Sequence, residues 1–198
     1  MSGTLKVGGV PLATHTGTDG LVTGMSWGSS VPSGTILQVQ YTQLTTNTSQ
    51  VLSADTSTAI TSLTVDITPR LTGSIIKLES YLFGEMNTAN TPNGSASFFY
   101  RDSTKLANTE GTPGDRIQGI GITNISYYAE NRDTTPESWT TTFFDTPTIP
   151  STPIQITYKL GFQALAGTTI WINRSVSDSD YNYVERGCSF ISATEIKG

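Results

Sequence analysis

The chain has 198 residues, a formal net charge of −5 at pH 7 and a pI of about 4.7. Its eleven lysines and arginines are scattered, so no basic stripe is present to bind nucleic-acid phosphates or an anionic membrane surface. Charged residues make up only 14% of the chain, whereas 34 Thr and 22 Ser exceed a quarter of it. This composition is typical of secreted or virion-surface β-proteins. The only cysteine, Cys188, excludes an intrachain disulfide framework.

Residues 1–34 differ in composition from the rest of the chain. They are rich in Gly, Thr and Ser, and their apolar residues are isolated. A disordered leader and an arm that becomes ordered on a partner are both compatible with this composition. We favour the extended attachment arm, in which two short strand-like pairs, Leu5/Val7 and Val10/Leu12, are the anchors.

From residue 35 onward, apolar residues at every second position predict strands with one buried face. The first expected strand covers 36–43, and residues 45–58 form a polar loop or a weak edge strand. Further strands are expected at 63–67, 76–82 and 98–101, and then a long one at 117–128 that carries Ile120 and Ile122 on one face. The last four are expected at 139–144, 154–162, 169–175 and 187–196.

Eight or nine strands without an intervening helical pattern predict an all-β domain. We therefore expect an antiparallel, jelly-roll-like β-sandwich at 35–198, preceded by the arm at 1–34. Cys188 lies within the apolar run of the last strand, so we expect it to be a small buried core residue.

The residues needed for common catalytic and metal sites are scarce. The only histidine, His15, lies in the leader, which argues against Ser-His-Asp, Cys-His and multi-His metal sites. Asp178 and Asp180 begin a run like a calcium loop, but Tyr183 stands where the EF-hand needs glycine. We expect a solvated acidic loop there, and we predict neither a cofactor nor a metal, with Asp178 and Asp180 as a weak candidate pair. Two carboxylate pairs, Glu110/Asp115 and Glu130/Asp133, keep glycoside hydrolysis open as an alternative.

Aromatic residues near the ends of the expected strands give a candidate glycan-binding set, because flat rings pack against sugar faces and polar neighbours bond sugar hydroxyls. The alternative is that most of them cover the core or a subunit interface. The candidates are Tyr127, Tyr128, Trp139, Trp171, Asn173, Arg174, Tyr181 and Tyr183.

Several short motifs, taken in their order and spacing across 34–198, resemble the C-terminal knob domain of bacteriophage fibre and virion decoration proteins of marine phages and cyanophages. These motifs lie at 34–39, 62–69, 73–78, 100–104, 143–147, 157–159, 172–175, 186–187 and 194–196. The resemblance implies a trimeric β-sandwich knob on the virion surface. The short leader departs from long tail fibres and suits a head fibre, a capsid decoration protein or a small tail accessory equally well.

The expected function is therefore that of a non-enzymatic phage virion protein. It is made in the host cytoplasm and displayed on the virion surface as a homotrimer. Its arm docks to capsid or tail proteins, and its knob serves adhesion to host surface polysaccharide or decoration of the particle. Two alternatives remain open: a carbohydrate-binding module in a non-viral setting and a polysaccharide depolymerase. We expect no nucleic-acid partner and no membrane insertion.

Overall fold

The computed structural model describes residues 2–7, 10–16, 31–86, 95–107, 114–122 and 134–198, and these ranges contain strands but no helix. No helix that could cross a membrane is therefore found within them. The strands are β1 (Ser2–Val7), β2 (Val10–Thr16), β3 (Ile36–Leu44), β4 (Thr48–Leu52), β5 (Thr58–Ile67), β6 (Ile75–Met86), β7 (Ser95–Arg101), β8 (Thr104–Leu106), β9 (Gly121–Ile122), β10 (Glu137–Asp145), β11 (Ile156–Ala164), β12 (Thr168–Ile172) and β13 (Ser189–Ile196). The prediction of an all-β antiparallel sandwich is confirmed.

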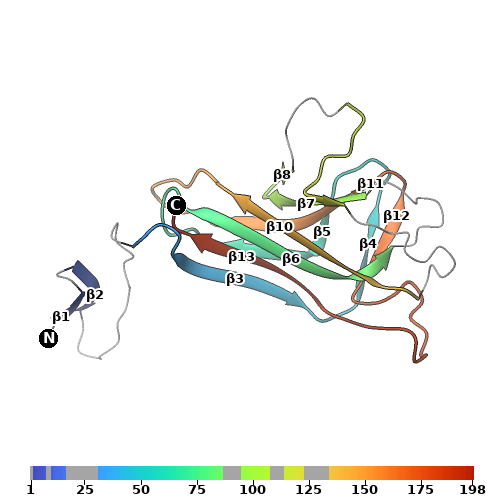
Figure 1. The fold of residues 1–198 in the computed structure, drawn as a ribbon, viewed down its shortest axis with the longest axis horizontal. Helices are drawn as coiled ribbons and strands as arrows, with labels where there is room; N and C mark the ends of the chain where they lie inside the picture. Colours follow the sequence, from blue (N-terminus) through green and yellow to red (C-terminus); the bar gives the residue numbers. More distant parts are fainter. Residues whose placement is uncertain (1, 8–9, 17–30, 87–94, 108–113, 123–133) are drawn as a thin grey trace.

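One layer is built around β6, the longest strand. Strands β3, β13, β6 and β10 pair in that order, and all of these pairs are antiparallel. Strand β12 pairs with the last residues of β6 and carries β4 at its other edge. Figure 1 shows β3, β13, β6 and β10 side by side along the length of the sandwich.

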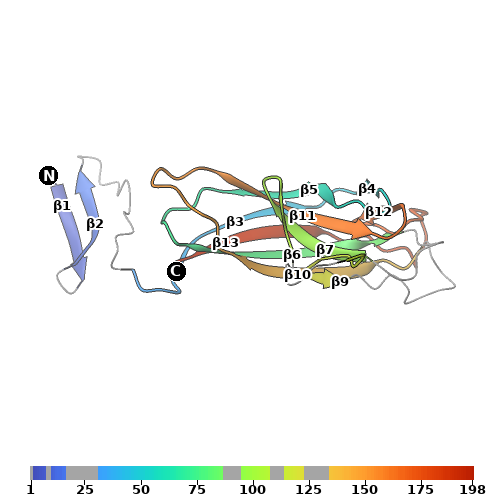
Figure 2. The same ribbon diagram turned by 90° about the horizontal axis from the view of Figure 1, so that it is seen from above.

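The second layer consists of β5, β11, β7 and β8 in that order, and β9 pairs with the start of β7 on the same edge as β8. Figure 2 shows the two layers in profile, with β5 and β11 on one side and β13, β6 and β10 on the other. The faces that meet between the layers hold the core, which includes Leu78, Phe99, Phe162 and Ile191, all fully buried. Two packed sheets with interdigitating inner faces form the usual β-sandwich core.

A polar network also crosses the interior. The carboxylate of Asp145 on β10 accepts a bond from Arg101 Nη1 at 2.8 Å and another from the Tyr158 hydroxyl at 2.7 Å. Burial, and then the bond to Asp145, raises the pKa of Tyr158, so its hydroxyl stays a donor at all physiological pH values. Because the three residues come from β7, β10 and β11, the network fastens one layer to the other.

The chain enters and leaves the sandwich at the same end, which we call the proximal end. Gly34 N donates to Lys197 O at 2.8 Å, and Lys197 N donates to Thr35 O at 2.9 Å. The buried Glu195 lies beside this clasp and accepts bonds from the amides of Arg70 and Leu71, which fixes the turn before β6. The opposite end, where β3 and β6 finish, is the distal end.

Strands β1 and β2 pair with each other as an antiparallel hairpin with Val7 opposite Val10. Leu5 and Val7 thus lie in β1, and Val10 and Leu12 lie in β2, so both predicted anchor pairs are in strands. Their docking on a partner remains a prediction.

Two sequence predictions are wrong. The long strand expected at 117–128 is reduced, within the part of the chain that the structure describes, to Gly121–Ile122 beside Ala96 and Ser97. Ile122 points into solvent with 88% of its surface exposed. Cys188 is exposed, because the neighbouring Ser189 is the residue that turns inward.

Candidate functional site

The feature of the distal end that is richest in specific contacts is the loop between β12 and β13, residues 173–187, which we call the distal loop. Asn173 holds its base. Asn173 is fully buried, and its backbone has the left-handed conformation with φ of 64°. Its side-chain nitrogen donates to Leu44 O at 2.8 Å and to Thr46 O at 2.9 Å, and its side-chain oxygen accepts from Ser189 Oγ at 2.6 Å. Asparagine is one of the few residues that tolerate this backbone conformation.

A buried carboxylate and a guanidinium brace the first half of the distal loop. Glu85 Oε2 on β6 accepts from Val176 N at 2.7 Å, and Glu85 Oε1 accepts from Thr135 N at 3.2 Å. Arg174 donates to Ser175 O and Val176 O, while its guanidinium lies 4.4 Å from the centre of the Trp171 ring. These contacts fix the loop backbone before any ligand binds, which lowers the ordering cost of binding.

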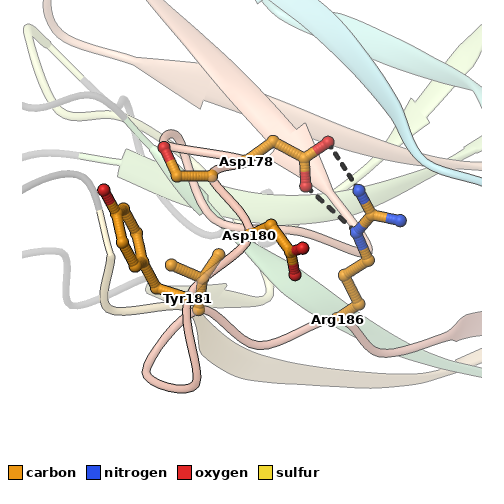
Figure 3. A pocket seen from close by; sticks show the side chains of 6 residues that line it. Asp178, Asp180, Tyr181 and Arg186 are labelled. Atoms are coloured by element: carbon orange, nitrogen blue, oxygen red, sulfur yellow. Dashed lines mark hydrogen bonds and ion pairs between the residues drawn. The ribbon is translucent and has the colours of Figure 1, made fainter.

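The second half of the distal loop forms a small open pocket. Asp178 and Arg186 form a two-bond ion pair, with Nε to Oδ1 at 3.0 Å and Nη2 to Oδ2 at 2.9 Å (Figure 3). Asp180 and Tyr181 lie beside this pair, and Ser179 and Val184 complete the lining. Arg174 also approaches Asp178, with its Nη1 at 3.6 Å from Oδ2. The two guanidiniums already neutralise Asp178, so a calcium ion would have to displace one of them.

Two tyrosines project from the tip of the distal loop. Tyr181 and Tyr183 are 59% and 55% exposed, and their rings stack on each other at 5.2 Å with 6° between their planes. Because the two rings stack, they form one contiguous exposed aromatic surface, and such a surface is more informative about a ligand or partner site than a single exposed ring. Their mutual stacking restricts the rotamers of both rings, and one ring face of each remains open.

A second carboxyl group lies near the base of the distal loop. Burial raises the pKa of Glu137 at the start of β10, and the charge of Glu85 raises it further. The nearby indole N–H of Trp139 acts in the opposite direction and lowers the pKa of Glu137. Its geometry does not meet the criteria for a hydrogen bond. The raised pKa lets Glu137 hold a proton beside Glu85. No group of three or more His, Cys, Asp or Glu that could bind a metal is found in the described ranges.

The structure separates the predicted glycan-binding residues into three sets. Tyr181, Tyr183 and the guanidinium of Arg174 lie on or beside the distal loop. Trp171 and Asn173 support that loop from below. The expectation that Trp139 lies at a strand end and faces solvent is wrong. Strand β10 begins two residues before Trp139 and turns its side chain into the core against Phe162.

The remaining candidates, Tyr127 and Tyr128, fall outside the described residues. The same holds for Glu110, Glu130 and Asp133, so neither carboxylate pair considered for hydrolysis is seen complete.

Sequence reasoning missed three residues that shape the distal loop: Glu85, Arg186 and Ser189. Glu85 lies 91 residues from the amide that it binds, so no local pattern points to this contact. Arg186 is eight residues from Asp178, a spacing that a search for opposite charges within one loop could have found. Ser189 follows the cysteine that we expected to be buried.

Comparison with known proteins adds no assignment. No protein-family model matches the chain, and no curated protein matches its sequence. Function is therefore inferred from the geometry of the chain itself.

Proposed function

We propose that the protein is a bacteriophage virion structural protein, a fibre or capsid-decoration component, that binds host surface polysaccharide without cleaving it. The observation that carries this proposal is the placement of the pre-formed aromatic distal loop at the end opposite the proximal clasp. One end of the sandwich then serves attachment through the arm at 1–34, and the other end is presented outward.

The chemistry of the distal loop suits a saccharide. The open ring faces of Tyr181 and Tyr183 supply apolar area for the C–H faces of a sugar. Asp180 and the outer edge of the Asp178–Arg186 pair supply acceptors and donors for hydroxyl groups. All of these groups are held by a braced loop, so little conformational freedom is lost on binding.

A homotrimer is part of the proposal. Three copies that present their distal loops to one surface bind by avidity, which can exceed single-site affinity by about 10²–10⁴ when the host polysaccharide is dense. Weak individual sites are then sufficient for adhesion.

The test is binding to polysaccharide extracted from the host, measured on a glycan array and by calorimetry. We expect Tyr181→Ala and Tyr183→Ala each to weaken binding about tenfold. Ile154→Ala is the matched control, because Ile154 is an apolar residue of similar exposure, 58%, outside the distal loop. Absence of binding by the wild type would remove the adhesion role and leave particle decoration.

Two further measurements separate the alternatives. Release of reducing sugar from the polysaccharide would show a depolymerase instead. Glycan binding by a protein that never enters particles would show a non-viral carbohydrate-binding module.

A further inference from the structure

The outward side of the β3–β13–β6–β10 layer is unusually apolar for a solvent-facing sheet. Residues directly opposite one another in antiparallel strands share a face, so the register defines three rows on this side. They are Val39–Thr194–Lys77–Phe144, Tyr41–Ser192–Glu79–Thr142 and Gln43–Phe190–Tyr81–Thr140. A fourth row at the proximal end, Ile36–Ile196–Ile75, is entirely aliphatic. We call these four rows the outer apolar face.

The large side chains of the outer apolar face are well exposed. Tyr41 is 72% exposed, Phe144 57%, Val39 52% and Phe190 40%. Phe190 also stacks on Tyr81 with ring centroids 6.1 Å apart, so the two rings form one continuous aromatic surface. An antiparallel sheet with one wet face normally alternates apolar residues inward and polar residues outward, and each of the four strands of this face breaks that rule at one or more positions.

The outward side of the other layer provides an internal comparison. There Asp66 accepts from Thr157 Oγ1 at 2.6 Å, Lys159 donates to Asp102 O, and Lys105 donates to Ser57 and Gln163. That side is mainly polar, charged and hydrogen-bonded, and Ile122 on β9 is the one large apolar residue exposed on its described strands. The apolar character is therefore specific to one layer and does not follow from the composition of the whole chain.

Charge decides which occupant fits the outer apolar face. Its rows hold one cation and one anion, Lys77 and Glu79, and these bond each other at 2.9 Å. The face is thus electrically neutral on a chain whose net charge is −5. A second copy of the chain can approach through this face without the repulsion that two acidic surfaces would impose, and depletion of charge with enrichment of aromatic residues is typical of an interface core.

The size of the face is also adequate. Four strands about 4.8 Å apart, over about eight residues of β6 at about 3.4 Å each, give a flat area of roughly 500 Å². Protruding aromatic side chains raise the accessible area above this projected value. The accessible area of the outer apolar face therefore approaches the roughly 800 Å² that each partner buries in a standard interface.

We propose that copies of this chain associate through the outer apolar face. This inference rests on the self-association contained in the proposed function and names the surface that performs it. It is independent of whether the distal loop binds a glycan.

The test is the oligomeric state of the full chain by sedimentation velocity and light scattering across a micromolar concentration series. We expect the wild type to be oligomeric and Tyr41→Glu or Phe190→Glu to raise the dissociation constant about 30-fold or more, as for interface hot spots. Val39→Lys is a third variant; Val39 is 52% exposed on the edge strand β3, so the introduced charge stays outside the core. Ile122→Glu is the matched control, because it places a charge at an exposed aliphatic strand residue of the other layer and should leave the oligomer intact.

Each outcome is decisive. A monomeric wild type would overturn both self-association and this surface. An oligomer that survives Tyr41→Glu, Phe190→Glu and Val39→Lys with an unchanged circular dichroism spectrum would overturn this surface alone. A monomer that binds another virion protein through these residues would show that a different partner covers the face.

Discussion

Replacing Asn173 by alanine should be one of the most destabilising single changes in the distal half of the protein. The substitution removes two donated bonds, to Leu44 O and Thr46 O, and the acceptor of Ser189 Oγ. Each lost bond costs about 1 kcal/mol net. Alanine at φ of 64° adds about 1 kcal/mol more, because its Cβ disfavours the left-handed conformation. The sum is about 4 kcal/mol.

Equilibrium unfolding in urea measures this loss. With a slope of about 2 kcal/mol/M, the midpoint should fall by about 2 M. Asn173→Gly keeps the backbone conformation free of strain while losing the same bonds, so its loss should be smaller by about the conformational 1 kcal/mol. Asn182→Ala is the control, since Asn182 is exposed on the same loop, and it should stay within about 0.5 kcal/mol of the wild type.

A loss below about 1 kcal/mol for Asn173→Ala would refute the reasoning that these buried bonds hold the loop to the sandwich. Equal losses of unfolding free energy for the alanine and glycine variants would also refute it, because the left-handed backbone conformation would then cost alanine nothing extra. Hydrogen exchange of the Ser175 and Val176 amides distinguishes local melting of the distal loop from global destabilisation.

Three further results are expected. Because burial raises the pKa of Glu137 above its ordinary 4.5, its contribution to stability is complete below pH 4.5 and is lost as the pH rises through the raised pKa; Glu137→Gln should flatten that decline in thermal unfolding midpoint. Gly161→Ala should cost about 1–3 kcal/mol because its Cβ would come within 2.4 Å of the Phe98 ring, whereas Gly167→Ala, with ordinary contacts from 3.7 Å, should be close to neutral in the same urea assay. Deleting residues 1–30 leaves the proximal clasp intact, so circular dichroism should show a folded sandwich while particle incorporation is lost; an unfolded product would contradict the arm assignment.

The alternation of apolar residues was sufficient to predict most strands of the sandwich. Leu63, Val65 and Ile67 are all buried on β5, and Tyr158 and Leu160 are buried on β11, as the period of two requires. The pattern works there because only one parity is apolar, so the buried face is unambiguous.

The same pattern is insufficient where both parities are apolar. In β13, Phe190 and Ile191 are adjacent, and periodicity alone cannot say that Ile191 enters the core while Phe190 faces outward. Register against β3 and β6 decides this, and register depends on contacts distant in sequence. The outer apolar face could not be predicted for that reason. Cys188 lies two residues before Phe190 and is exposed like it, as the alternation requires.

The distal loop was predictable only in part. Exposed Tyr181 and Tyr183 were named from composition near strand ends, but the frame that positions them was not. Asn173 resembles any turn asparagine in the sequence, and its role appears only when β3 brings the carbonyls of Leu44 and Thr46 within bonding distance.

The two proposals together require one arrangement of copies. The outer apolar face runs along the strands from the proximal to the distal end, so a rotation axis parallel to the strands gathers all distal loops at one end and all arms at the other. A twofold axis perpendicular to the strands would point the loops in opposite directions and prevent joint binding to one surface. Cys188, the only cysteine, is exposed at the distal end and accepts a spin label without further mutation. Labels on associated copies should give short, mutually similar distances by pulsed electron resonance if the axis is parallel. If the axis is perpendicular, the Cys188 labels of two copies lie at opposite ends of the assembly and are separated by about its full length. Such long distances would exclude the parallel arrangement, and with it the avidity on which adhesion by weak single sites depends.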